Sequence, residues 1–392
     1  MDIGLEVLLN KPQLAKNWGR CALLCNQASV NRKFTHATSL LRDLLGDKLA
    51  ALLGPQHGFI STVQDNMIES NHATDRNGIP VYSLYSETRE PTKNMLEDVD
   101  TILIDLQIVG CRVYTFKATV RACLTAAQKF GKKVVVLDRP NPLGGVLIEG
   151  RSLDANCRSF VGPDEIPMRH GLTIAECAQL FNREIGAKLE VVPMESWKVW
   201  EDWGKSRRPW VLTSPNLPTW DSVSVYPGLV LLEGTNISEG RGTTLPFQLI
   251  GAPYISNPEK IVKKINDYGN KVSSGLFLRP TQFLPLFGKW ANNVCHGFQI
   301  HVLDHEQVKS YALGIATIHS IMSEYPKEFL WKEPPYEYEY TRKPIVFLIG
   351  SDHYQNHFDS FKISDPFWRE ELDDFLNRSS DYLIYPRERI LV

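Results

Sequence analysis

The 392-residue chain lacks the features of a membrane or nucleic-acid protein. No stretch approaches the roughly 20 consecutive apolar residues of a membrane span. No run of basic residues is longer than a pair, and the net charge is only −2. We therefore expect no membrane insertion and no nucleic-acid partner. The first ten residues carry no basic segment followed by an apolar one, which indicates a cytoplasmic protein. An exported precursor whose signal had been removed would have the same sequence.

Motifs of several common chemistries are absent as well. No G-x-G-x-x-G follows the first expected strand and no G-x-x-x-x-G-K-[ST] occurs, which argues against nucleotide binding. There is no G-x-S-x-G nucleophile motif, and the absence of H-E-x-x-H or clustered histidines predicts no metal site. The seven cysteines form no C-x-x-C pair, so we expect reduced thiols and not a disulfide framework.

Alternating secondary-structure patterns fill the first half of the chain. Apolar strands are expected at 21–25, 48–53, 101–105 and 133–138, with helices at 38–45, 115–129 and 171–184 and an edge strand at 188–193. Strands that are apolar throughout and separated by helices predict a parallel sheet covered on both faces. Past 197 the pattern becomes mixed, with helices expected at 258–268, 306–323 and 366–377 and strands at 276–287 and 296–303. The sequence thus predicts an α/β fold followed by a smaller α+β region.

The segment Glu233–Thr244 is the most informative stretch. Its twelve residues include two acids, Glu233 and Glu239, together with Asn236, Arg241 and three glycines. Glycine lets a backbone approach a ligand closely. Apolar runs flank the segment, so we expect it to follow a buried strand at 229–232, where binding residues collect.

Polar side chains also follow the other predicted strands. Because ligands bind beyond the carboxyl ends of parallel strands, we expect these side chains to share one rim. The candidates are His57, Asp105, Arg112, Tyr114, Asp138, Arg139, Asn141, Glu149, Arg169 and His170. For any single acid among them an ion pair with an arginine is the simpler interpretation, and for a single histidine a core hydrogen bond.

A succession of motifs covers most of the chain in order. These are Gly54-Pro-Gln-His-Gly-Phe59, Gln64-Asp-Asn-Met-Ile-Glu-Ser70, Pro80-Val-Tyr-Ser-Leu-Tyr85, Asp138-Arg-Pro-Asn-Pro-Leu-Gly-Gly145, Arg158-Ser-Phe-Val-Gly162, Pro167-Met-Arg-His-Gly-Leu-Thr173, Ser214-Pro-Asn-Leu-Pro-Thr219 and Glu233 to Thr244. With them the chain resembles the exo-β-N-acetylmuramidase (NamZ) family, glycoside hydrolase family 171.

The resemblance implies a Rossmann-like N-terminal domain over 1–230, a smaller C-terminal domain over 231–392 and an active site in the cleft between them. It also implies removal of terminal N-acetylmuramic acid from the non-reducing ends of peptidoglycan fragments during cell-wall turnover. The expected partner is a muramic-acid-containing sugar or a muropeptide, and no metal or organic cofactor is expected.

The sequence departs from the family at two positions. Many relatives carry Pro-Glu-His-Gly where this chain has Gln56, and a second aspartate where it has Ile108. Glutamine cannot donate a proton to a leaving group, whereas glycoside hydrolysis usually needs two carboxyl groups. We therefore expect Asp65 or Glu69 to replace the missing acid, with Glu233 and Glu239 in the cleft, one of them as acid or base.

Muramic acid carries a lactyl carboxylate, which a planar guanidinium binds with two hydrogen bonds. Arg241 is the first candidate for this contact, followed by Arg139 and Arg112. His57, Asn141 and Asn236 are candidates for hydroxyl or acetamido groups. The remaining candidate binding residues are Gln56, Asp105, Tyr114, Asp138 and His170.

Three functions remain open from the sequence. The first is a glycosidase, the second a sugar-binding protein that kept the cleft but lost the acid, and the third a Rossmann-type nucleotide enzyme. A ligand that binds only the native state raises its melting point. Muramic acid derivatives raise it under the first two interpretations, and nucleotides only under the third.

Overall fold

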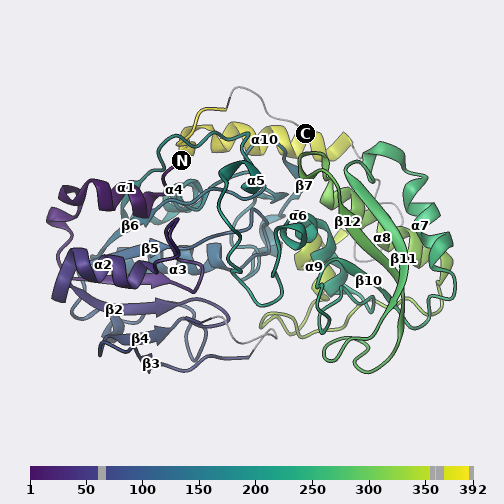
Figure 1. Ribbon diagram of the computed structural model, residues 1–392, viewed down its shortest axis with the longest axis horizontal. Helices are drawn as coiled ribbons and strands as arrows, with labels where there is room; N and C mark the ends of the chain where they lie inside the picture. Colours follow the sequence, from purple (N-terminus) through teal and green to yellow (C-terminus); the bar gives the residue numbers. More distant parts are fainter. Residues whose placement is uncertain (61–67, 354–357, 359–365, 388–392) are drawn as a thin grey trace.

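The computed structural model describes residues 1–60, 68–353, 358 and 366–387. Its larger sheet has seven strands in the order β3-β4-β2-β1-β5-β6-β9 (Figure 1). The strands are β1 (Cys21–Cys25), β2 (Leu49–Gly54), β3 (Ala73–Thr74), β4 (Pro80–Ser83), β5 (Thr101–Asp105), β6 (Lys133–Leu137) and β9 (Lys188–Val192). All neighbouring pairs are parallel except β3–β4. The predicted α/β class is confirmed.

Helices cover both faces of this sheet, and alternate side chains of β1 pack on opposite faces. Leu23 belongs to the core formed with α1 (Gly4–Asn10) and α2 (Ala37–Leu45). Leu24 belongs to the core formed with α3 (Phe116–Phe130) and α4 (Ile174–Ile185). This double burial explains why the strands read as continuous apolar runs.

The second half builds a smaller antiparallel sheet, as predicted. Its order is β10 (Leu249–Ala252), β12 (Cys295–Val302), β11 (Leu276–Phe283). The helices of this half are α6 (Trp220–Leu229), α7 (Pro258–Asn266), α8 (Ser310–Glu324), α9 (Pro344–Ile349) and α10 (Pro366–Ser379). The short helix α5 (Trp203–Ser206) and a ribbon of β7 (Glu149–Ser152) and β8 (Pro167–Arg169) lie between the two sheets in the sequence. Helix α10 returns to pack near β7, so this helix lies over the first half of the chain (Figure 1).

The expected strand at 229–232 is wrong. This run is the end of α6 and the following 3-10 turn η5 (Val230–Gly234). A short apolar run has no periodicity that separates a buried strand from a fully buried helix. The segment Glu233–Thr244 therefore follows a helix, although the apolar run after it does form β10.

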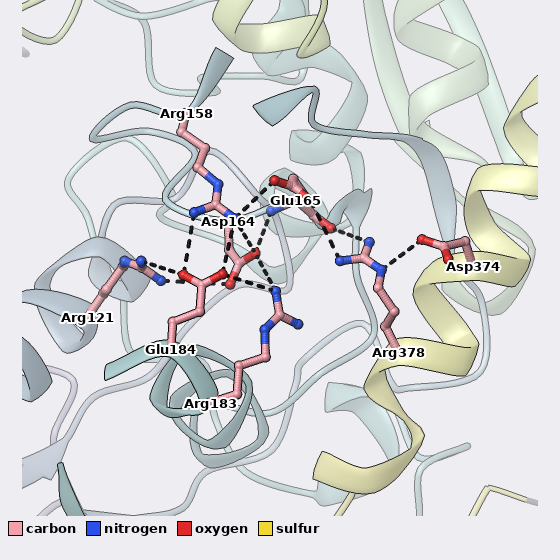
Figure 2. A network of polar contacts seen from close by, with 8 residues as sticks. All are labelled: Arg121, Arg158, Asp164, Glu165, Arg183, Glu184, Asp374 and Arg378. Atoms are coloured by element: carbon pink, nitrogen blue, oxygen red, sulfur yellow. Dashed lines mark hydrogen bonds and ion pairs between the residues drawn. The ribbon is translucent and has the colours of Figure 1, made fainter. Parts of the chain in front are cut away.

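A network of charges fixes the loop over residues 158–165. Asp164 is fully buried and its carboxylate lies 3.2 Å from Arg183, 3.7 Å from Arg158 and 3.8 Å from Arg121 (Figure 2). On the far side of the loop, Arg378 of α10 donates a 3.0 Å bond to the carbonyl of Glu165. The network thereby ties the loop to α3, α4 and α10.

Candidate active site

A narrow pocket lies where the two halves of the chain meet. Gln56 and His57 line it from the end of β2, Glu233 and Arg241 from the segment after α6, and Glu337 from the segment 334–341. The pocket encloses about 30 Å³. Residues far apart in sequence converge here, because the carboxyl end of a parallel strand opens toward the second half of the chain.

Glu337 is the centre of a buried hydrogen-bond cluster. Its Oε1 accepts a 3.0 Å bond from Gln56 Nε2, and its Oε2 accepts a 2.9 Å bond from the Tyr85 hydroxyl. Gln56 Nε2 also donates to the Tyr85 oxygen at 3.0 Å, and its Oε1 accepts from Thr115. Burial raises the pKa of Glu337, the nearby charge of Glu233 adds to the rise, and the bonds from Gln56 and Tyr85 oppose it. The net effect favours the protonated acid.

Glu233 belongs to a second, charged cluster beside the first. Its Oε1 accepts a 2.5 Å bond from Arg241 Nη2 and its Oε2 a 2.8 Å bond from the Tyr336 hydroxyl. Arg241 Nε also lies 3.3 Å from Glu239, which in turn accepts a 2.8 Å bond from Lys289. Burial alone would raise the pKa of Glu239, but Lys289 and Arg241 lower it overall. Burial alone would lower the pKa of Arg241, but Glu233 and Glu239 raise it overall and keep the guanidinium charged.

Three non-glycine residues of the pocket wall have left-handed backbones. The φ angles are +69° at His57, +63° at Phe247 and +46° at Glu337. Such angles are uncommon outside glycine, and they persist where the surrounding structure over-determines them, often at functional sites. Both glycines beside Arg241 also have positive φ, +80° at Gly240 and +82° at Gly242. These positive φ angles explain why glycine stands on both sides of Arg241.

A wider cavity opens on the other side of His57. It encloses about 590 Å³ and is lined by Gly58, Phe59, Tyr82 and Ser83 among others. His57 lines both spaces, and its Nε2 lies 3.2 Å from the Ser214 hydroxyl. Two buried acids and Arg241 thus line the narrow pocket, whereas the wider cavity has a volume typical of ligand sites.

The structure brings several of the predicted site residues into the narrow pocket. They are Gln56, His57, Tyr114, Glu233 and Arg241, with Glu239 directly behind Arg241. Glu69 lines neither space, and its half-exposed carboxylate lies 3.5 Å from Arg89 Nη2. Asp65 lies outside the described residues.

Other predicted residues have internal partners and do not line the pocket. Asp105 and Arg139 form a buried bidentate pair at 2.6 and 2.8 Å. Arg112 donates to four backbone carbonyls, two of them at the end of α9. Asp138 accepts bonds from Thr173 and the backbone of Ala175 at the start of α4.

Asn141, His170 and Asn236 also lie outside the pocket. Asn141 bridges the backbone of Leu143 and Leu172. Asn236 bonds the backbone of residues 328 and 330. Burial, with Lys117 nearby, lowers the pKa of His170 well below its usual value and leaves the ring neutral. The two remaining rim candidates, Glu149 and Arg169, pair with each other at 3.2 Å.

Sequence reasoning missed Glu337, Tyr85 and Tyr336. Gln56 and Glu337 are 281 positions apart, so no local pattern connects them. The one available signal was the run Pro334-Pro-Tyr-Glu-Tyr338, which combines a carboxyl group with aromatic side chains in a region without regular structure.

Within the part of the chain that the structure describes, no group of three or more His, Cys, Asp or Glu side chains is arranged to hold a metal ion. No helix in that part is both long and apolar enough to span a membrane.

The fold and the pocket define an α/β protein with buried acids of opposed character, an arrangement typical of glycosidases. Family comparison makes the assignment specific. Residues 21–221 match the model for the N-terminal part of exo-beta-N-acetylmuramidase NamZ, and residues 224–385 match the model for its C-terminal part. The chain belongs to the NamZ family.

Individual relatives agree with this assignment. The chain is 42% identical over 331 residues to the peptidoglycan beta-N-acetylmuramidase NamZ of Bacillus subtilis (strain 168), covering 84% of this chain and 79% of that protein. It is also similar to crystal structures of two DUF1343 family proteins from Bacteroides fragilis NCTC 9343. The first has a TM-score of 0.85 at 29% identity and covers 98% of this chain and 99% of its own. The second has a TM-score of 0.75 at 26% identity and covers 99% of both chains.

Proposed function

We propose that the protein is an exo-acting β-N-acetylmuramidase that releases terminal N-acetylmuramic acid from the non-reducing ends of peptidoglycan fragments. Family membership supports the reaction, and the single observation that carries the catalytic assignment is Glu337. It is a buried acid with a raised pKa, and it is bonded to the glutamine that stands where many relatives have glutamate.

In this proposal Glu337 is the general acid that protonates the glycosidic oxygen of the leaving sugar. A general acid must hold its proton near the working pH, which burial favours here. Gln56 and Tyr85 orient the carboxyl group. Neither Asp65 nor Glu69 is then needed to replace the acid absent at position 56.

Glu233 is the second carboxyl group, acting on the sugar carbon or on the attacking water. Arg241 and Tyr336 each bond one of its oxygens and hold it in position. Arg241 is also the candidate for binding the lactyl carboxylate of muramic acid, which gives selectivity over N-acetylglucosamine.

The test is hydrolysis of a chromogenic N-acetylmuramic acid β-glycoside, with the N-acetylglucosamine analogue as the control substrate. We expect muramic-selective release whose kcat falls as pH rises through the raised pKa of Glu337, because the acid then loses its proton. Glu337→Gln should lower kcat by about 100-fold or more.

Glu339→Gln is the matched control, since Glu339 belongs to the same segment but does not line the pocket. Full activity of the Glu337 variant would remove it as the acid. If the wild type releases nothing while muramic acid still raises the melting point, the protein is a sugar-binding protein on a glycosidase fold.

A further inference from the structure

A second cavity lies on the opposite face of α6 from the catalytic pocket. It encloses about 170 Å³ and is lined by residues 142–144, 146 and 147, the start of α6 and the turn η7 (His305–Gln307). Trp220 and Ser224, four residues apart on one helix face, line this cavity, whereas Tyr226 lines the catalytic pocket. Two residues correspond to about 200° around a helix, so the two spaces are separated by the body of α6.

Aromatic rings form one wall of this cavity. The rings of Trp220 and His305 stack with centroids 3.6 Å apart and an interplanar angle of 3°. Asp221 holds the imidazole in place with a 2.8 Å contact to Nε2. Trp200 stands at the rim with 49% of its surface exposed. Flat aromatic faces of this kind pack against the C–H face of a pyranose ring.

Two buried donors at the cavity have no acceptor within the described part of the chain. One is the indole Nε1 of Trp220 and the other is Nε of Arg169. Arg169 is only 4% exposed, and its other two nitrogens bond Glu149 and the carbonyls of residues 143 and 308. A buried donor without a partner is costly, so both favour a ligand that supplies acceptor oxygens.

Both cations at the cavity are paired with carboxylates. Lys205 pairs with Glu306, and Arg169 pairs with Glu149. Asp202 accepts a bond from the backbone N–H of Lys205 at the start of α5. An anionic or cationic ligand would have to break one of these pairs, whereas a neutral polyhydroxyl ligand would not.

We propose that this cavity is a second carbohydrate site that binds a neutral N-acetylhexosamine ring. The choice of a glycan as ligand rests on the proposed function. The ring stacks on the aromatic wall, and its acetamido or hydroxyl oxygens accept from Trp220 Nε1 and Arg169 Nε. A fragment that reached both sites would bind more tightly than either site alone allows.

The test uses tri-N-acetylchitotriose, which contains no muramic acid and is therefore no substrate for the proposed reaction. Its Kd is measured by isothermal titration calorimetry for the wild type, Trp220→Phe and Trp200→Ala. Trp220→Phe keeps a ring against His305 and removes the donor, while Trp200→Ala removes the half-exposed rim ring. We expect each to raise Kd by about tenfold, the loss of roughly one hydrogen bond or ring contact.

Phe277→Ala is the control, because Phe277 is an aromatic residue of β11 that is 56% exposed and lies outside the cavity. It should leave Kd unchanged, and all three variants should keep wild-type hydrolysis of the small chromogenic muramic glycoside. Absence of chitotriose binding by the wild type would overturn the proposal. The proposal would also be overturned if Glu233→Gln abolished chitotriose binding while the cavity variants left it unchanged.

If the proposed function is wrong, the measurements will give a different result. Chitotriose would still bind and respond to Trp200→Ala, but the muramic glycoside would not be cleaved. Should Trp220→Phe fail to fold, as judged by its circular dichroism, the half-exposed Trp200 decides the result alone.

Discussion

Gln56 and Glu337 have complementary hydrogen-bonding groups, a donor and an acceptor. The amide Nε2 of Gln56 donates to both the carboxylate of Glu337 and the oxygen of Tyr85. A glutamate at position 56, as the family resemblance gives for many relatives, has no such donors when ionised. In this chain the amide of Gln56 therefore holds the carboxyl group of Glu337 in place.

Gln56→Glu should therefore make stability depend on pH. Two carboxyl groups at the 3.0 Å distance of the present bond cannot both ionise, so one holds its proton and its pKa rises. A raised folded-state pKa gives stability that is present below the unfolded value and lost as pH rises through the folded value. We expect the melting point of the variant, relative to wild type, to fall between about pH 5 and pH 8, the range above the unfolded pKa of Glu.

Thermal melts across this pH range check the prediction. Gln299→Glu is the control, because Arg279 already lies 2.5 Å from that side chain and would pair with the new charge. Parallel melting profiles for Gln56→Glu and wild type would show that the two carboxyl groups do not share the site.

Site residues could be predicted from the sequence where they lie close together in one motif. Glu233, Arg241 and their glycines form one continuous motif, so sequence alone placed them together. Asp105, Arg139 and Asp138 also follow strands, as expected, but the ion pairs and helix-cap bonds they form inside the fold cannot be read from spacing. Glu337 was missed because its partners come from the other end of the chain.

At the scale of elements, the segment 334–341 forms one wall of the candidate active-site pocket. It carries Tyr336 and Glu337 into the pocket, and the ring of Tyr338 packs against the ring of Tyr85. The guanidinium of Arg89 lies 4.2 Å from the ring centroids of both Tyr85 and Tyr338. Arg89 and Tyr85 both belong to the first half of the chain, so the contact of Arg89 with Tyr338 joins this segment to that half.

Removing that link should loosen the segment. Each cation–π contact contributes about 0.5–2 kcal/mol, so Arg89→Ala should increase amide hydrogen exchange across 334–341 by about tenfold or more. We expect kcat/KM to fall as well, since Glu337 is then less well positioned. Hydrogen exchange read by mass spectrometry and initial rates measure the two effects.

Lys93→Ala, a change of an exposed cation near Arg89 in sequence, should alter neither quantity. Unchanged exchange in the Arg89 variant would mean that the bonds of Glu337 and Tyr336 alone hold the segment.

The regular elements were predictable to different degrees. The four apolar strands and helices α2, α3, α4 and α7 match the sequence patterns. Each of these segments has either a single hydrophobic periodicity or a uniformly apolar composition. Helix α6 was missed because it is buried on both faces, carries Pro227 and follows a stretch dense in tryptophan and proline. Burial on all sides removes the amphipathic pattern on which helix prediction depends.

At the scale of the whole molecule, the two halves share one core. A single cluster of buried side chains contains Leu24 of β1, Leu229 of α6 and Phe298 of β12. Helices α6 and α8 pack backbone to backbone: a Cβ on Gly228 would lie 1.6 Å from the carbonyl oxygen of Ser310. The sequence predicted two structural regions but could not show that a continuous core joins them.

This continuity predicts one cooperative unfolding transition. Gly228→Ala forces α6 and α8 apart, and such overpacking costs about 3 kcal/mol of unfolding free energy. Because the core is shared, the midpoints from far-UV circular dichroism and tryptophan fluorescence should fall together. Gly162→Ala, where a Cβ meets only the end of the Leu153 side chain at 3.2 Å, is the control and should cost much less. A shift in one probe alone would mean that the two halves unfold independently, and that the pocket between them assembles only after each has folded.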